Sequence, residues 1–151
     1  MTSIFVRFYE AIIRAGEAFQ SYLLLAMRLY WGFQFYQTGM GKLNNLPQIV
    51  KFFQNLGIPF AETQAPMVAY LEAGGGILLM IGLASRLVSI PLTAVLLTAL
   101  ATAHRDALLN IFQDPDTFIS QPPFNFLIMT LVVFAFGPGK FSLDYLLERK
   151  K

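Results

Sequence analysis

Four apolar stretches run through this chain, at residues 22–41, 65–84, 87–103 and 122–137, with polar or turn-forming segments between them. A helix rises about 1.5 Å per residue, so about 20 apolar residues cross a hydrocarbon core of about 30 Å. We therefore predict four membrane-spanning helices, of which the last is short for a full crossing. The predicted fold is all-α: a transmembrane four-helix bundle that forms a single domain over residues 1–151.

Residues 3–20 follow a different pattern, that of an amphipathic helix. At about 100° per residue, the apolar positions fall within one narrow arc: Ile4, Phe8, Ile12, Ala15 and Phe19. The charged positions fall on the opposite side: Arg7, Glu10, Arg14 and Glu17. We predict an N-terminal interfacial helix that lies on the membrane. The alternative is an amphipathic helix docked on a partner protein.

The segments between the apolar stretches carry turn signals. Residues 42–64 contain asparagine, proline and glycine around an apolar run at residues 49–56, which predicts a short helix against the bilayer. Residues 83–86 predict a tight turn, so the second and third spans are expected to be antiparallel neighbours. Residues 105–121 predict a surface flap, and residues 142–151 predict a short terminal helix.

The composition supports a membrane protein. Hydrophobic residues make up 56% of the chain and charged residues 13%, against about 45–50% and about 25% in soluble domains. A net charge of +2 is too small to favour nucleic acid as a partner. The chain has no cysteine and one histidine, which excludes disulfide, iron–sulfur and bis-histidine haem chemistry within it. A metal site is not expected.

The basic residues predict the orientation in the bilayer, because cytoplasmic loops carry an excess of lysine and arginine. One side of the predicted bundle would hold seven of them: Arg7, Arg14, Arg86, Lys140, Arg149, Lys150 and Lys151. The opposite side would hold three: Lys42, Lys51 and Arg105. We therefore expect both termini in the cytoplasm.

Polar residues within the spans are the candidate site. Six of them come out at similar depth in the outer half of the bundle: Gln34, Gln37, Lys42, Glu72, His104 and Asn125. Ionisable groups within spans are costly and are functional by default. We therefore predict a polar cavity, open to the outer leaflet or periplasm, that binds a ligand around Glu72. Alternatively, Glu72 pairs with a cation only to fix helix register.

Two cations on the first span, Arg28 and Lys42, are alternative partners for the charge of Glu72. Arg28 lies lower in the span and Lys42 lies near its outer end. Gly32 and Gly39 share their face and would let a neighbouring helix approach closely. We expect an ionised Glu72 bonded mainly to Arg28, whose fixed fork suits a carboxylate, with Lys42 nearer the mouth. The glycine run at residues 74–76 is expected to serve helix packing.

Several motifs together resemble the DoxX family. They are Arg28 and Gly41-Lys42 in the first span, YLEAGGGILLMIGLASR at residues 70–86, and FGPGKFSLD at residues 136–144. The resemblance covers roughly residues 21–144, and Arg28, Lys42, Glu72 and Arg86 match recurring positions. It implies a small four-span protein of the plasma membrane, usually bacterial. The family is named for its likeness to the small subunit of an archaeal thiosulfate:quinone oxidoreductase.

The hypothesis we favour for the function is a redox-accessory subunit whose pocket binds a quinone. Arg28, Gln34 or His104 would donate hydrogen bonds to the quinone carbonyls. No redox group is intrinsic to the chain, so electrons would come from a soluble redox partner or from the quinone. The alternatives are a non-redox binding or transport module for a small or lipid-like molecule, and a scaffold for a soluble partner. An accessory subunit is favoured over an autonomous enzyme, and no catalytic residue is assigned.

Overall fold

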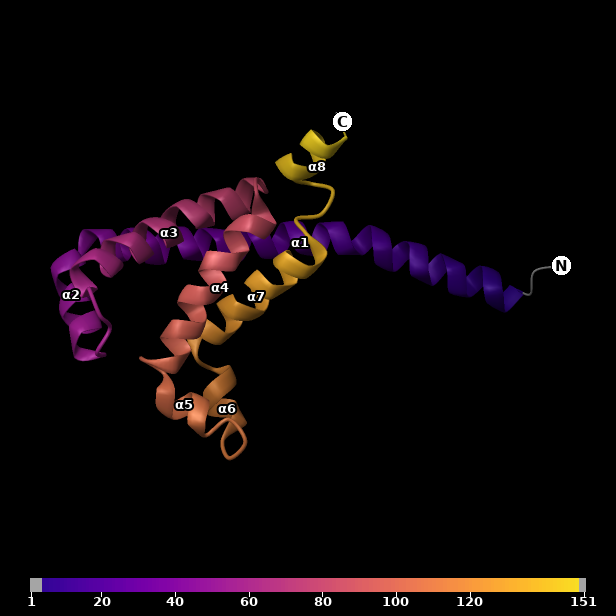
Figure 1. Cartoon of the computed structure of the whole chain (residues 1–151). Helices are drawn as coiled ribbons and strands as arrows, with labels where there is room; N and C mark the ends of the chain where they lie inside the picture. Colours follow the sequence, from indigo (N-terminus) through magenta and orange to yellow (C-terminus); the bar gives the residue numbers. More distant parts are fainter. Residues whose placement is uncertain (1–3, 150–151) are drawn as a thin grey trace.

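A computed structural model describes residues 4–149 of the chain, and all of its regular elements there are helices (Figure 1). Their bounds are α1 Ile4–Asn44, α2 Leu46–Asn55, α3 Ala61–Ile81, α4 Ser85–Ala101, α5 Arg105–Leu109, α6 Pro115–Ile119, α7 Pro122–Phe136 and α8 Leu143–Glu148. The all-α prediction is confirmed for this part of the chain. Three further predicted elements are confirmed. The short helix at 49–56 corresponds to α2, the flap without a long helix contains α5 and α6, and the terminal helix is α8.

Helix α1 differs from the prediction because it is one continuous helix of 41 residues. The predicted boundary between an interfacial helix and a first span, near residue 21, is therefore wrong. The residues around it contain no proline or glycine that would stop a helix. Figure 1 shows the N-terminal half of α1 projecting away from the other helices. Ser3, in the predicted amphipathic segment, lies outside the described residues; the interfacial position stays a prediction.

Glycines allow α1 and α3 to pack in close contact. A Cβ built on Gly39 would overlap the backbone of Ala73, and one built on Gly76 would lie 2.6 Å from the backbone nitrogen of Tyr36. Gly32 is also close-packed, with the carbonyl oxygen of Gly76 at 2.9 Å from its built Cβ. The packing role predicted for these glycines is confirmed.

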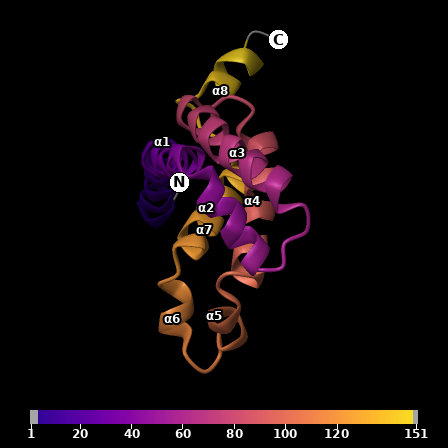
Figure 2. The ribbon, with the colours of Figure 1, turned by 90° about the vertical axis from the view of Figure 1, so that its left-hand side faces the viewer.

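Helices α4 and α7 form a second closely packed pair. Buried apolar side chains join them, among them Leu92, Leu96, Met129 and Val133. The Thr93 hydroxyl donates to the Thr130 hydroxyl at 3.0 Å. Figures 1 and 2 show this pair diverging from the α1–α3 pair toward α2 and the α5–α6 flap. The space between the two pairs is therefore widest at the α2 end.

The C-terminal segment is fastened to the turn between α3 and α4. The carboxylate of Asp144 accepts hydrogen bonds from the backbone N–H groups of Ala84 at 2.7 Å and Ser85 at 2.9 Å. The backbone N–H of Asp144 donates to the Gly82 carbonyl at 2.9 Å. Asp144 therefore satisfies donors at the first turn of α4 that no intrahelical carbonyl can reach.

Length and composition identify one span candidate among the described helices, α3, with 21 residues. Helices α4 and α7 are apolar but shorter, with 17 and 15 residues. The tight turn between α3 and α4 is present, yet the main partner of α3 is α1 and that of α4 is α7. The architecture is thus two helix pairs around a shared apolar core.

Candidate functional site

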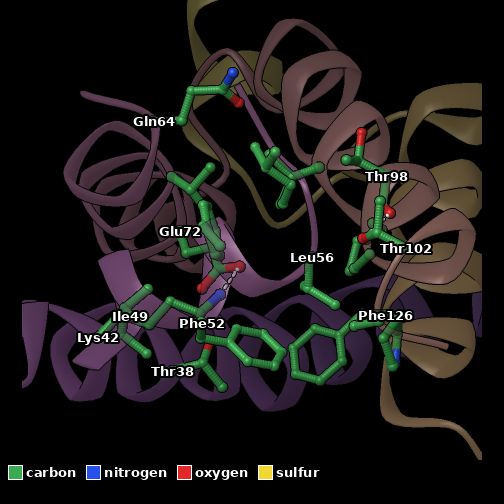
Figure 3. Close-up of a pocket in the computed structure, with 18 of the residues that line it drawn as sticks. Thr38, Lys42, Ile49, Phe52, Leu56, Gln64, Glu72, Thr98, Thr102 and Phe126 are labelled. Atoms are coloured by element: carbon green, nitrogen blue, oxygen red, sulfur yellow. Dashed lines mark hydrogen bonds and ion pairs between the residues drawn. The ribbon is translucent and has the colours of Figure 1, made fainter. Parts of the chain in front are cut away.

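A cavity of about 410 Å³ lies where the two helix pairs diverge, and α2 covers one side of it. Its walls come from α1, α2, α3, α4 and the start of α7 (Figure 3). Most of the lining is apolar, including Phe35, Ile49, Phe52, Phe53, Leu56, Ile58, Val68, Leu96 and Phe126. Ligand cavities in proteins commonly have this character: an apolar body with a few polar groups.

The ion pair between Lys42 and Glu72 forms the charged part of the cavity wall. Lys42 Nζ donates to Glu72 Oε1 at 2.5 Å, and the line between them is drawn in Figure 3. The Glu72 side chain is 6% exposed and that of Lys42 is 27% exposed. The second carboxylate oxygen, Glu72 Oε2, is buried without a hydrogen-bond partner. A buried carboxylate is therefore only partly satisfied by the protein.

Arg28 is not the partner of Glu72, which corrects the sequence-based expectation. Its guanidinium donates to the backbone carbonyl of Phe141 at 2.5 Å and to that of Leu79 at 3.4 Å. Arg28 and Lys42 share a face of α1 but lie 14 positions apart, which is about 21 Å along the axis. Once Lys42 faces Glu72, Arg28 lies at the other end of α3. It fastens the C-terminal segment and does not line the cavity.

His104 lines the cavity at the end of α4, next to the flap. Its Nδ1 lies 2.7 Å from Gln121 Oε1, and Gln121 Nε2 donates to the Thr117 carbonyl at 2.8 Å. The second bond fixes which end of the Gln121 amide is the oxygen. Nδ1 must therefore carry a proton and donate to Gln121 Oε1.

Three of the predicted polar residues lie away from the cavity. Gln34 donates to the Tyr30 hydroxyl at 3.4 Å, and Gln37 and Asn125 are exposed. Equal depth does not mean a shared face: at about 100° per residue, Gln37 is rotated by about 140° from Lys42. Of the seven predicted ligand-binding residues, the structure brings together Lys42, Glu72 and His104. Whether these bind a ligand stays a prediction.

Sequence reasoning missed the contributions of α2 and of the end of α4. The apolar face of α2 closes one side of the cavity, and the wall also includes Thr98 of α4 and Thr102, the residue that follows α4. The i, i+4 spacing of these threonines was a usable signal, because it places both on one face. Phe35 of α1 also lines the cavity, where its ring packs edge-on against that of Phe126, with the ring centroids 4.6 Å apart.

Comparison with known proteins agrees with the sequence motifs. The sequence model of the DoxX family matches residues 23–105, more than half of the chain. The chain belongs to the DoxX family. Within the family region lie all of α2, α3 and α4, the part of α1 from residue 23 onward, and the Lys42–Glu72 pair.

Two curated relatives are distant in sequence. CatD of Bacillus subtilis (strain 168), a protein named provisionally as an oxidoreductase, is 27% identical over 105 residues, which cover 70% of each chain. An uncharacterised protein of Haemophilus influenzae is 23% identical over 130 residues, which cover 83% of each chain. No solved structure matches the chain.

Proposed function

We propose that this DoxX protein spans the plasma membrane four times, through α1, α3, α4 and α7, with both termini in the cytoplasm. Large apolar side chains on the outer faces of α4 and α7 support the proposal: Leu87, Ile90, Leu97, Ile128, Leu131 and Phe134 are all exposed. A soluble monomer rarely exposes apolar surface on this scale, whereas lipid would cover it. Tilt or local thinning of the bilayer would accommodate the short α7.

Within the membrane, the cavity is proposed to bind a quinone-type molecule: an apolar body with polar oxygens on its ring. The observation that carries this proposal is the Lys42–Glu72 ion pair in the wall of a mostly apolar cavity. An ion pair that only fixed the register of α1 against α3 would not require an adjacent cavity. The cavity volume of about 410 Å³ falls in the range of small-molecule sites, about 300–1,000 Å³.

The proposed role is that of a redox-accessory subunit. The protein would hold the quinone while electrons arrive from a soluble redox partner, because the chain has no cysteine and none of its residues is a redox group. The provisional naming of CatD as an oxidoreductase agrees with this role. A non-redox binding module for a lipid-like molecule is the competing function.

The test is extraction of the purified protein with organic solvent, followed by mass spectrometry. We expect a quinone at near one equivalent per chain. Ala99→Phe should reduce it at least tenfold, because Ala99 lines the cavity and a phenyl ring would fill part of it. Ala101→Phe is the matched control, since Ala101 is exposed on the same helix and does not line the cavity. Another apolar molecule in place of the quinone would favour the non-redox function.

A further inference from the structure

The threonine hydroxyls that line the cavity have already used their protons on backbone carbonyls. Thr38 donates to Phe35 at 3.0 Å. Thr98 donates to Ala94 at 2.9 Å, and Thr102 donates to Thr98 at 2.7 Å. A hydroxyl has one proton and two lone pairs, so each of these oxygens can only accept a further hydrogen bond.

Other polar groups of the cavity wall also have their protons engaged or accept hydrogen bonds. The Nδ1–H of His104 is committed to Gln121, and the Glu72 carboxylate, which is paired with Lys42, accepts hydrogen bonds. Rotation about the last bond of Glu72 is soft, so either of its oxygens can turn to meet a donor. The remaining donors of the lining side chains are N–H groups of Lys42 and Gln64, from α1 and α3.

Hydrogen-bond donors and acceptors are therefore unevenly distributed over the cavity wall. Figure 3 shows Thr98 and Thr102 across the cavity from Lys42 and Glu72, with apolar side chains such as Leu56 and Phe126 between them. The α4 wall offers acceptors alone. A carbonyl oxygen placed against that wall would meet oxygens without protons, whereas a hydroxyl group would find partners.

We propose that the cavity prefers the reduced, hydroxyl-bearing form of its ligand, a hydroquinone, over the oxidised form, a quinone. The preference rests on the proposed function, because it presupposes that a quinone-type ring enters the cavity. The two forms have nearly the same shape and differ in that the hydroquinone has two O–H donors. Hydrogen-bond matching at the α4 wall is thus the property that separates them.

The test measures binding of three probes to the full-length protein in lipid nanodiscs by anaerobic titration calorimetry, with empty nanodiscs subtracted. The probes are trimethylhydroquinone, trimethyl-1,4-benzoquinone and the dimethyl ether of the hydroquinone, which keeps the ring but has no donor. We expect the hydroquinone to bind at least tenfold more tightly than the other two. Thr98→Val and Thr102→Val together should reduce the preference below about threefold, because valine is branched like threonine and lacks the hydroxyl oxygen that accepts the hydrogen bond.

Thr63→Val is the matched control, because Thr63 is exposed and does not line the cavity, and it should keep the full preference. Equal or tighter binding of the benzoquinone would overturn the preference while leaving the proposed function in place. Absence of binding by all three probes would overturn the proposed function and the preference together. The comparison among probes on the unmodified protein needs no variant to fold.

Discussion

Lys42 Nζ lies 2.5 Å from Glu72 Oε1, and this ion pair joins α1 to α3 beside the cavity. The carboxylate is nearly fully buried, whereas the ammonium group lies closer to the surface. Removing the cation would leave a buried charge uncompensated, which is the costly way to break such a pair. The pair therefore contributes to the α1–α3 register as well as to the cavity wall.

Lys42→Met is expected to lower the free energy of unfolding by about 3–5 kcal/mol, because Glu72 would stay buried without a cation. Adding Glu72→Gln should recover part of this loss, since the neutral amide needs no counter-charge. Thermal unfolding in detergent micelles, read by circular dichroism, measures the single and double variants. The coupling between the two sites should lie at about 0.5–3 kcal/mol.

The control for the Lys42–Glu72 comparison is a second double-mutant cycle, between Arg28 and Glu72. Arg28→Gln combined with Glu72→Gln should show the sum of the two single losses to within about 0.3–0.5 kcal/mol, because the two residues share no contact. Strong coupling between Arg28 and Glu72, with none between Lys42 and Glu72, would contradict the observed pairing.

The glycine run at residues 74–76 offers a matched pair of substitutions. Gly76→Ala should destabilise the protein by about 1–3 kcal/mol, because the added methyl group would meet the backbone of α1. Gly74→Ala should be neutral or stabilising by up to about 1 kcal/mol, since open space surrounds that position. Unfolding midpoints of the two variants, measured in the same detergent, decide between these outcomes. Equal effects would mean that close packing does not set the role of Gly76.

Asp144→Ala should cost about 0.5–2 kcal/mol, the range for losing a helix cap, because it removes the acceptor for two N–H groups at the first turn of α4. The C-terminal segment should also be cut sooner by a protease, since one of its attachments to the α3–α4 turn is gone. Limited proteolysis with mass spectrometry measures this. Glu148→Ala, at an exposed position of α8, is the control and should leave cleavage unchanged.

Asp114 is expected to titrate below the ordinary aspartate range. Hydrogen bonds from the Thr117 hydroxyl at 2.6 Å and the Thr117 backbone N–H at 3.2 Å favour the charged form and lower the pKa of Asp114. The folded form then binds its proton less readily than the unfolded form. The stabilising effect is present above the unfolded pKa and is lost as the pH falls through the folded pKa. Carboxyl NMR titration should show this, and Thr117→Val should raise the pKa of Asp114.

Membrane topology can be read from single cysteines, because the natural chain has none. We expect Gln113→Cys, on the flap, to react with an impermeant maleimide added outside the cell. Glu148→Cys, on α8, should react only after the cells are opened. Both positions are exposed, so burial does not protect them. The reverse labelling pattern would invert the proposed orientation.

The sequence by itself determined the elements whose signals are local. The apolar stretches and proline or glycine turns are short-range features, and they predicted helices close to α3, α4 and α7 and the separate helix α2. The close approach of α1 and α3 also followed from local spacing, because Gly32 and Gly39 lie on one helix face. Glu72 was recognisable as a buried charge that needs a partner, since it stands alone in an apolar segment.

Tertiary structure decided which groups meet. The choice of Lys42 over Arg28 depends on the axial register of α1 against α3, which the interlocking glycine contacts set and which no local pattern encodes. Gln34, Gln37 and Asn125 do not line the cavity, because the rotation of each helix about its own axis turns other residues toward it. The cavity itself exists because the α4–α7 pair diverges from the α1–α3 pair, and an angle between helices is a property of packed surfaces.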